Sequence, residues 1–142
     1  MRRLTTFLLA FLLLAASPTW AANELSVTAR LLFSKAGEPE LSVGQVEFTV
    51  TVTGTNYIRH VQNIGLSEEA LTLGDMTPGG WCYFENLDAT NFVEIRGATG
   101  ETDLVKMKAG EFSLLRMSAD ASAPYVIADT ATVDLLVACF EN

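Results

Sequence analysis

The only histidine limits the nucleophilic chemistry open to this chain. His60 lies between Arg59 and Val61 in a run of extended character, and any Ser-His-Asp or Cys-His mechanism would have to use it. Catalytic groups sit more often on loops than in the middle of a strand. We therefore interpret His60 as a structural or surface residue and predict that the chain is not an enzyme and has no catalytic residues.

Acidic side chains are the most numerous candidate ligands. The chain has 17 Asp and Glu against 9 Lys and Arg, a formal net charge of −8. Two sets of acids could supply oxygen ligands to Ca²⁺ if loops brought them together, but neither has the spacing of an EF-hand loop. These sets are Glu68, Glu69 and Asp75, and Glu85, Asp88 and Glu94. We predict no metal and no cofactor, and no nucleic-acid partner, because the negative charge would repel backbone phosphates.

Two cysteines allow a single internal pairing. Cys82 and Cys139 each lie within an expected strand. In an oxidising compartment they would form a disulfide between core strands, worth about 3 to 4 kcal/mol by the loop-entropy estimate. In a protein matured in the cytosol they would be two buried free thiols. Both alternatives are open on the sequence alone.

Aromatic residues gather around the first cysteine. Trp81 and Tyr83 alternate with Cys82, so they share one side of an expected strand. Exposed aromatic rings there could stack on the apolar faces of sugars, whereas aromatics of a central strand belong more often to the core. We expect Trp81 and Tyr83 to be the exposed members, and a glycan is a candidate ligand.

The first residues predict export rather than a part of the fold. Two arginines follow Met1, residues 4–16 are almost wholly apolar, and Thr19-Trp20-Ala21 offers small residues at a cleavage site. The apolar run of about a dozen residues is shorter than the roughly 20 that cross a bilayer, so no stable membrane span is expected. We predict a signal peptide with a signal-like helix over residues 1–21 and a single domain over residues 22–142.

Alternation with period two dominates the mature chain. Short strands separated by Gly, Pro and Asn turns predict an all-β fold of about 8–10 strands, a single antiparallel β-sandwich of jelly-roll type. Residues 67–71 could form a helical turn, residues 81–87 and 92–96 a hairpin, and the inward face of residues 57–64 stays open. The expected strands span residues 25–33, 46–53, 57–64, 81–87, 92–96, 104–107, 112–117, 125–128 and 133–140.

Four segments together resemble small structural proteins of tailed bacteriophage particles. They are residues 64–75 (IGLSEEALTLGD, followed by TPG at 77–79), residues 86–94 (NLDATNFVE), residues 107–116 (MKAGEFSLLR) and residues 125–131 (YVIADTA, followed by VDL at 133–135). The resemblance extends over residues 22–142. It implies a compact β-sandwich present in many copies on a phage head or tail, in contact with other virion proteins and with copies of itself.

The leader separates this chain from that family. Such proteins usually begin near the equivalent of Ala22 and have no leader. Two locations are therefore expected: the virion, or the periplasm or outside of the cell. In the second case the chain would be an exported binding module for glycans or for a cell-surface partner.

Overall fold

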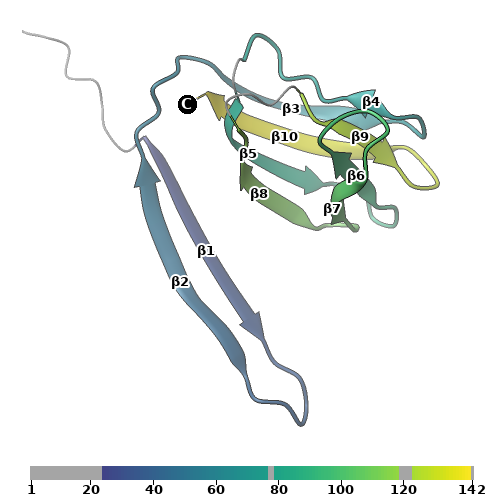
Figure 1. Ribbon diagram of the computed structural model, residues 1–142. Helices are drawn as coiled ribbons and strands as arrows, with labels where there is room; N and C mark the ends of the chain where they lie inside the picture. Colours follow the sequence, from purple (N-terminus) through teal and green to yellow (C-terminus); the bar gives the residue numbers. More distant parts are fainter. Residues whose placement is uncertain (1–23, 77–78, 119–122, 142) are drawn as a thin grey trace, which may run out of the picture. The chain divides into compact units, whose positions relative to one another are not determined.

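The computed structural model describes residues 24–76, 79–118 and 123–141, and this part of the chain is all-β (Figure 1). It contains ten strands and no helix, arranged in three antiparallel sheets. The predicted signal peptide, residues 1–21, lies outside the described residues. The chain divides between Thr51 and Val52 into two compact units, which are described separately below.

The first unit contains a two-stranded hairpin. Strands β1 (Leu25–Phe33) and β2 (Leu41–Val50) are antiparallel, with Leu25 opposite Val50 and Phe33 opposite Leu41. Gly37 in the connecting turn has φ 86°, a conformation that glycine adopts without steric cost.

The second unit holds two four-stranded sheets. Their orders are β3-β10-β5-β8 and β4-β9-β6-β7, and every neighbouring pair is antiparallel (Figure 1). The strands are β3 (Tyr57–Ile64), β4 (Glu69–Ala70), β5 (Gly79–Asn86), β6 (Val93–Arg96), β7 (Asp103–Met107), β8 (Phe112–Arg116), β9 (Tyr125–Ala128) and β10 (Val133–Glu141).

The strand pairing of this unit is nested. Strand β3 pairs with β10, β4 with β9, β5 with β8 and β6 with β7. The chain therefore runs as one long antiparallel hairpin that ends between β6 and β7, and the pairs fall alternately into the two sheets. Two further pairings, β10 with β5 and β6 with β9, join the pairs within each sheet.

One hydrophobic core draws side chains from both four-stranded sheets. Alternate residues of each strand are buried in it, as a period-two pattern requires. On β3 the inward face carries Ile58 and Ile64, while Tyr57 and Val61 are exposed, which answers the question that the sequence left open. The largest fully buried side chains are Phe84, Ile64, Met107, Leu135, Val93, Val126, Val133 and Val137.

Two local expectations were wrong. The expected helical turn at residues 67–71 is instead the short strand β4, because Leu71 N–H donates to the carbonyl of Pro124 and so joins this segment to the residues before β9. The expected hairpin does not form either, since β5 and β6 lie in different sheets. Turn residues after β5 fit a crossing between sheets as well as a hairpin, and local composition cannot separate the two.

Candidate functional site

The structure places the one candidate residue for nucleophilic chemistry in the middle of a strand. His60 lies in the middle of β3, between exposed Arg59 and Val61, as expected. Its Nε2 is buried without a hydrogen-bond partner, so no described hydroxyl, thiol or carboxylate forms a hydrogen bond with that nitrogen. The acids do not converge on a cation site: among the described residues, no group of three or more His, Cys, Asp or Glu side chains could hold a metal ion.

Glu68, one of the candidate cation ligands, forms hydrogen bonds and an ion pair with the turn between β6 and β7. Its carboxylate pairs with Arg96 at 2.9 Å, accepts the N–H of Gly100 at 3.0 Å and accepts the hydroxyl of Thr99. Arg96 also pairs with Asp103. These contacts connect the turn between β6 and β7 to the segment that precedes β4. The hydrogen bond from Thr99 and then that from Arg96 lower the pKa of Glu68 below its ordinary value.

Replacing Glu68 with Gln is expected to flatten the acid side of the stability profile. A carboxyl whose pKa is lower in the folded state stabilises the fold above its unfolded pKa of about 4.5, and this stability is lost as the pH falls through the folded value. Melting temperatures measured from pH 6 down to about pH 3 should therefore fall less steeply in Glu68→Gln. Exposed Glu101 of the same turn offers the control Glu101→Gln. Equal slopes in both variants and the natural chain would contradict the assignment.

Asn86 is a buried polar residue that the sequence indicated only as a turn former. It is fully buried at the end of β5, and its Nδ2 donates to the carbonyls of Asn91 at 2.9 Å and Met107 at 3.1 Å. Its Oδ1 accepts the N–H of Asp88 at 2.9 Å. The carboxylate of Asp88 accepts the N–H groups of Asn91 and Thr90 in turn, which lowers the pKa of Asp88. The run of Asn and Asp at residues 86–91 was the only sequence signal of this arrangement.

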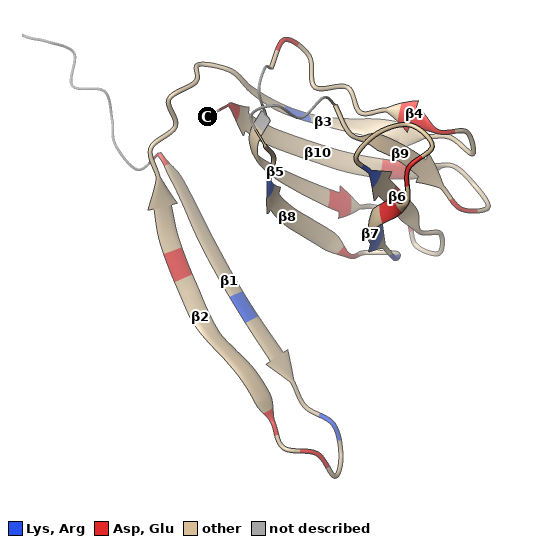
Figure 2. Ribbon diagram, in the orientation of Figure 1, with Lys and Arg blue, Asp and Glu red and all other residues tan. Residues whose placement is uncertain are grey.

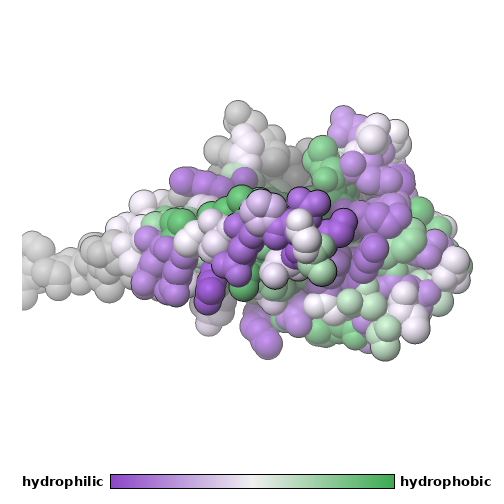
Figure 3. Space-filling model, turned by 90° about the horizontal axis from the view of Figure 1, so that it is seen from below, coloured by the Kyte–Doolittle hydropathy of each residue, from purple (hydrophilic) through white to green (hydrophobic). Residues whose placement is uncertain are grey.

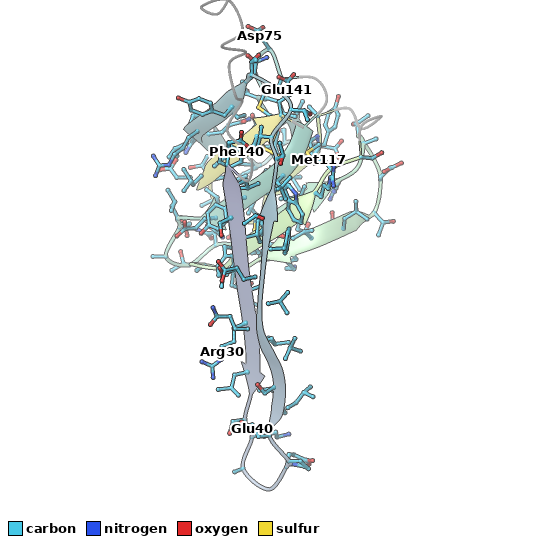
Figure 4. All side chains as sticks on the ribbon, turned by 90° about the vertical axis from the view of Figure 1, so that its left-hand side faces the viewer. Arg30, Glu40, Asp75, Met117, Phe140 and Glu141 are labelled. Carbon is cyan, nitrogen blue, oxygen red and sulfur yellow. A yellow bond between two sulfur atoms is a disulfide. The ribbon has the colours of Figure 1, made fainter. Side chains whose placement is uncertain are left out.

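The two cysteines lie directly opposite each other on neighbouring strands. Cys139 of β10 pairs in register with Cys82 of β5, the two Cα atoms are 4.2 Å apart, and the side chains form a disulfide. Both are fully buried in the core, with the thioether of Met117 3.4 Å from Cys82 Sγ. Figure 4 shows sulfur atoms within the sheet region of the ribbon.

The outward face of the sheet β3-β10-β5-β8 is rich in apolar and aromatic residues, and we call it the aromatic face. Trp81 and Tyr83 lie on it, both half-buried, on the side of β5 opposite to Cys82. The strand register arranges the face in three rows across the four strands: Tyr57, Phe140, Trp81 and Arg116; then Arg59, Ala138, Tyr83 and Leu114; then Val61, Leu136, Glu85 and Phe112.

Several side chains of the aromatic face remain open to solvent. Phe112 is 65% exposed and Tyr57 74% exposed. The ring of Tyr83 stacks on that of Phe112 with centroids 5.6 Å apart, and its hydroxyl donates to Glu85 at 2.9 Å. Partial burial, and then the hydrogen bond to Glu85, raise the pKa of Tyr83. Figure 3 shows hydrophobic residues at the surface in several places among hydrophilic ones.

The outward face of the other sheet has a different character. On β6 and β7, Glu94 lies opposite Lys106 and pairs with it at 3.0 Å, while Arg96 pairs with Asp103. The ammonium of Lys106 also lies 3.4 Å above the ring of Phe92. Figure 2 shows residues of both signs on β6 and β7. On this face Glu94, Arg96 and Lys106 form ion pairs within the chain. The aromatic face carries Arg59, Glu85 and Arg116 among its apolar side chains.

An open groove of about 420 Å³ follows the turn between β7 and β8. Residues of mixed character line it, including Lys106, Glu111 and Phe112. Lys106 is already paired with Glu94, and Glu111 accepts the N–H of Lys108 at 2.8 Å. The charged groups of these two residues are therefore already in contact with other parts of the chain.

Nothing in the described ranges has the helical length and hydropathy needed to cross a membrane. Comparisons of the chain with protein-family models, with curated proteins and with solved structures gave no match.

Proposed function

We propose that this chain is a non-enzymatic structural or decoration protein of a phage virion, and that it acts through contacts between subunits. The observation that carries the proposal is the aromatic face: a wide sheet surface on which Phe112, Tyr57 and Val61 are more than half exposed. These exposed side chains lie on the two edge strands of the sheet, Phe112 on β8 and Tyr57 and Val61 on β3. Exposed apolar residues that share one face of a sheet can mark an interaction site in a soluble protein. The resemblance of residues 22–142 to phage particle proteins supports the same role.

We infer further that the second unit is a jelly-roll β-sandwich. A jelly roll is a long antiparallel hairpin rolled into two four-stranded sheets, and the nested pairing of β3 through β10 follows that plan. The core shared by the two sheets supports the sandwich. Such a domain has two broad outward sheet faces, and in this chain one carries ion pairs and the other the aromatic residues. Covering the aromatic face with a neighbouring subunit removes its exposed apolar side chains from water.

The proposed role places the protein in the virion, and the alternative role places it in the periplasm or outside the cell. A virion protein is recovered with purified particles, whereas an exported module would remain with the periplasm or the medium. The leader favours export, and the disulfide between Cys82 and Cys139 fits an oxidising compartment. The two locations therefore predict different fractions and different N-termini.

The test is peptide mass spectrometry on purified phage particles and on the particle-free supernatant of the same culture. We expect peptides of residues 22–142 in the particle fraction, with Ala22 as the first residue if the leader is removed. Phe112→Ser is expected to reduce incorporation into particles about tenfold or more, because it removes an exposed anchor of the aromatic face. Leu104→Ser is the matched control, since Leu104 is 74% exposed on β7 of the other sheet. Recovery only in the supernatant would overturn the virion role.

A glycan-binding module is the second candidate, and the stacked pair of Tyr83 and Phe112 beside Glu85 is the observation that favours it. An aromatic ring next to a carboxylate acceptor can stack on a sugar and accept its hydroxyl groups. Binding on a glycan array that is lost in Trp81→Ala and Tyr83→Ala, in a chain absent from particles, would establish this role instead.

A further inference from the structure

The hairpin β1-β2 has one face that is entirely apolar. Residues that point to the same side of the ribbon are opposite one another in the strand register, and none of them is charged or polar. We call this the apolar hairpin face; it consists of Leu25, Val27, Ala29, Leu31 and Phe33 of β1 and Leu41, Val43, Val46, Phe48 and Val50 of β2. The other side carries Ser26, Thr28, Arg30, Leu32, Ser42, Glu47 and Thr49.

An irregularity in β2 keeps this face continuous along the whole hairpin. Ala29 is opposite Val46 and Leu31 is opposite Val43, so two residues of β2, Gly44 and Gln45, lie across from one residue of β1. This bulge shifts the alternation of β2 by one position. Without it, Val43 would lie on the side opposite to Val46. In Figure 4, Arg30 points to the side away from a row of carbon-only side chains.

Six large side chains of the apolar hairpin face are exposed, while Val27 is only 5% exposed and Leu25 and Val50 are half-buried. A two-stranded ribbon has no second layer of its own. Its sheet contains only β1 and β2 among the described residues, and isolated hairpins are marginally stable in water. Leu31 is 59% exposed, Leu41 60% and Val46 52%, with Phe33, Val43 and Phe48 between 38% and 49%. Covering these side chains with another apolar surface would remove them from water, which is favourable.

We propose that the cover is the same face of a second copy of this chain, so that two hairpins pack face to face about a twofold axis. The area of the apolar hairpin face supports a second copy as the partner. The exposed fractions of the six large side chains together equal about three whole side chains, and at the lower end of the roughly 150–250 Å² of a buried aromatic side chain they offer about 500 Å² per copy. Two copies would bury about 1,000 Å² in total, the least area expected of a biological interface. An uncharged face is complementary to itself, as a twofold interface requires.

The charges of the hairpin favour this arrangement over an anionic lipid surface. Between residues 24 and 51 there are four acidic residues, Glu24, Glu38, Glu40 and Glu47, against Arg30 and Lys35. Figure 2 shows them beside the turn, at the strand ends and singly on each strand. Net negative charge opposes binding to anionic headgroups. Face-to-face packing leaves the charged side in water, and edge-to-edge pairing of two hairpins would leave the apolar hairpin face uncovered.

This inference deepens the subunit contacts proposed above, but it does not require a virion. The test compares two neighbouring leucines of the full chain by sedimentation velocity over a concentration series. Leu31 lies on the apolar hairpin face and Leu32, 50% exposed, on the other side. The natural chain and Leu32→Lys are expected to be dimers, and Leu31→Lys is expected to raise the dimer dissociation constant about tenfold or more. A monomeric natural chain, or equal dissociation constants for the two variants, would overturn the proposal.

A second pair of variants keeps the test valid if Leu31→Lys does not fold. Val46→Thr and Thr28→Val both exchange β-branched residues of similar shape, so the strands retain their β propensity. Val46→Thr is expected to weaken the dimer several-fold and Thr28→Val to leave it unchanged. A dimer that Phe112→Lys dissociates, and Val46→Thr does not, would assign the interface to the aromatic face and overturn this inference. Absence from phage particles would overturn the virion role and leave the dimer untouched.

Discussion

Asn86→Ala is expected to lower the free energy of unfolding of the second unit by about 2–4 kcal/mol. The substitution leaves the buried carbonyl of Met107 without its partner, and also the part-buried carbonyl of Asn91 and N–H of Asp88. Each unsatisfied buried polar group costs about 1–3 kcal/mol. Denaturant titration followed by the fluorescence of Trp81 measures this, because Trp81 is the only tryptophan after residue 21 and lies in the second unit.

Asn63→Ala is the matched control for Asn86. The amide of Asn63 also donates to an oxygen, that of Asp134 at 2.8 Å, but on the exposed side of β3. Water replaces an exposed partner, so the expected loss stays below about 0.5 kcal/mol. Asn86→Asp should be at least as damaging as Asn86→Ala, since a carboxylate would face two carbonyl oxygens. Losses of similar size at positions 63 and 86 would show that Asn86 has no special role.

Removing the disulfide is the second large effect. The double variant Cys82→Ala/Cys139→Ala is expected to lose about 2–4 kcal/mol of unfolding free energy, because the bridge closes a loop between residues 57 positions apart and so restricts the unfolded chain. The same fluorescence titration applies. A reductant should destabilise the natural chain by a similar amount and leave the double variant unchanged.

Thiol titration under denaturing, non-reducing conditions gives the independent measurement. We expect no free thiol in the natural chain isolated from its native compartment. Two free thiols would contradict the disulfide and would favour maturation in the cytosol. The outcome therefore also bears on whether the leader is used.

Much of the strand pattern was predictable because alternation is a local property. The bounds expected for residues 25–33, 57–64 and 125–128 agree with β1, β3 and β9. Strand β2 begins earlier than expected, at Leu41 instead of residue 46. The reason is the bulge at Gly44 and Gln45, which breaks the period-two pattern at the point where the first half of β2 meets the second.

The candidate sites were less predictable, because their environment is built by distant parts of the chain. Asn86 looked like one turn residue among several, and it became buried only when the end of β7 and the turn before β8 packed against it. The register of β5 on β10 places Cys82 opposite Cys139. The sequence shows both cysteines, but it does not show that they lie opposite each other on neighbouring strands.

Sequence alone determined the all-β class, most strand positions and the alternation that makes one face of each strand apolar, since these depend on neighbouring residues. The tertiary structure decided which strands pair, that β5 and β6 lie in different sheets, and that one outward sheet face is ion-paired while the other is aromatic. The physical reason is that every strand offers the same backbone N–H and C=O groups at its edges, so these groups do not select a partner strand. The partner is selected by the burial of side chains that lie far apart in the sequence.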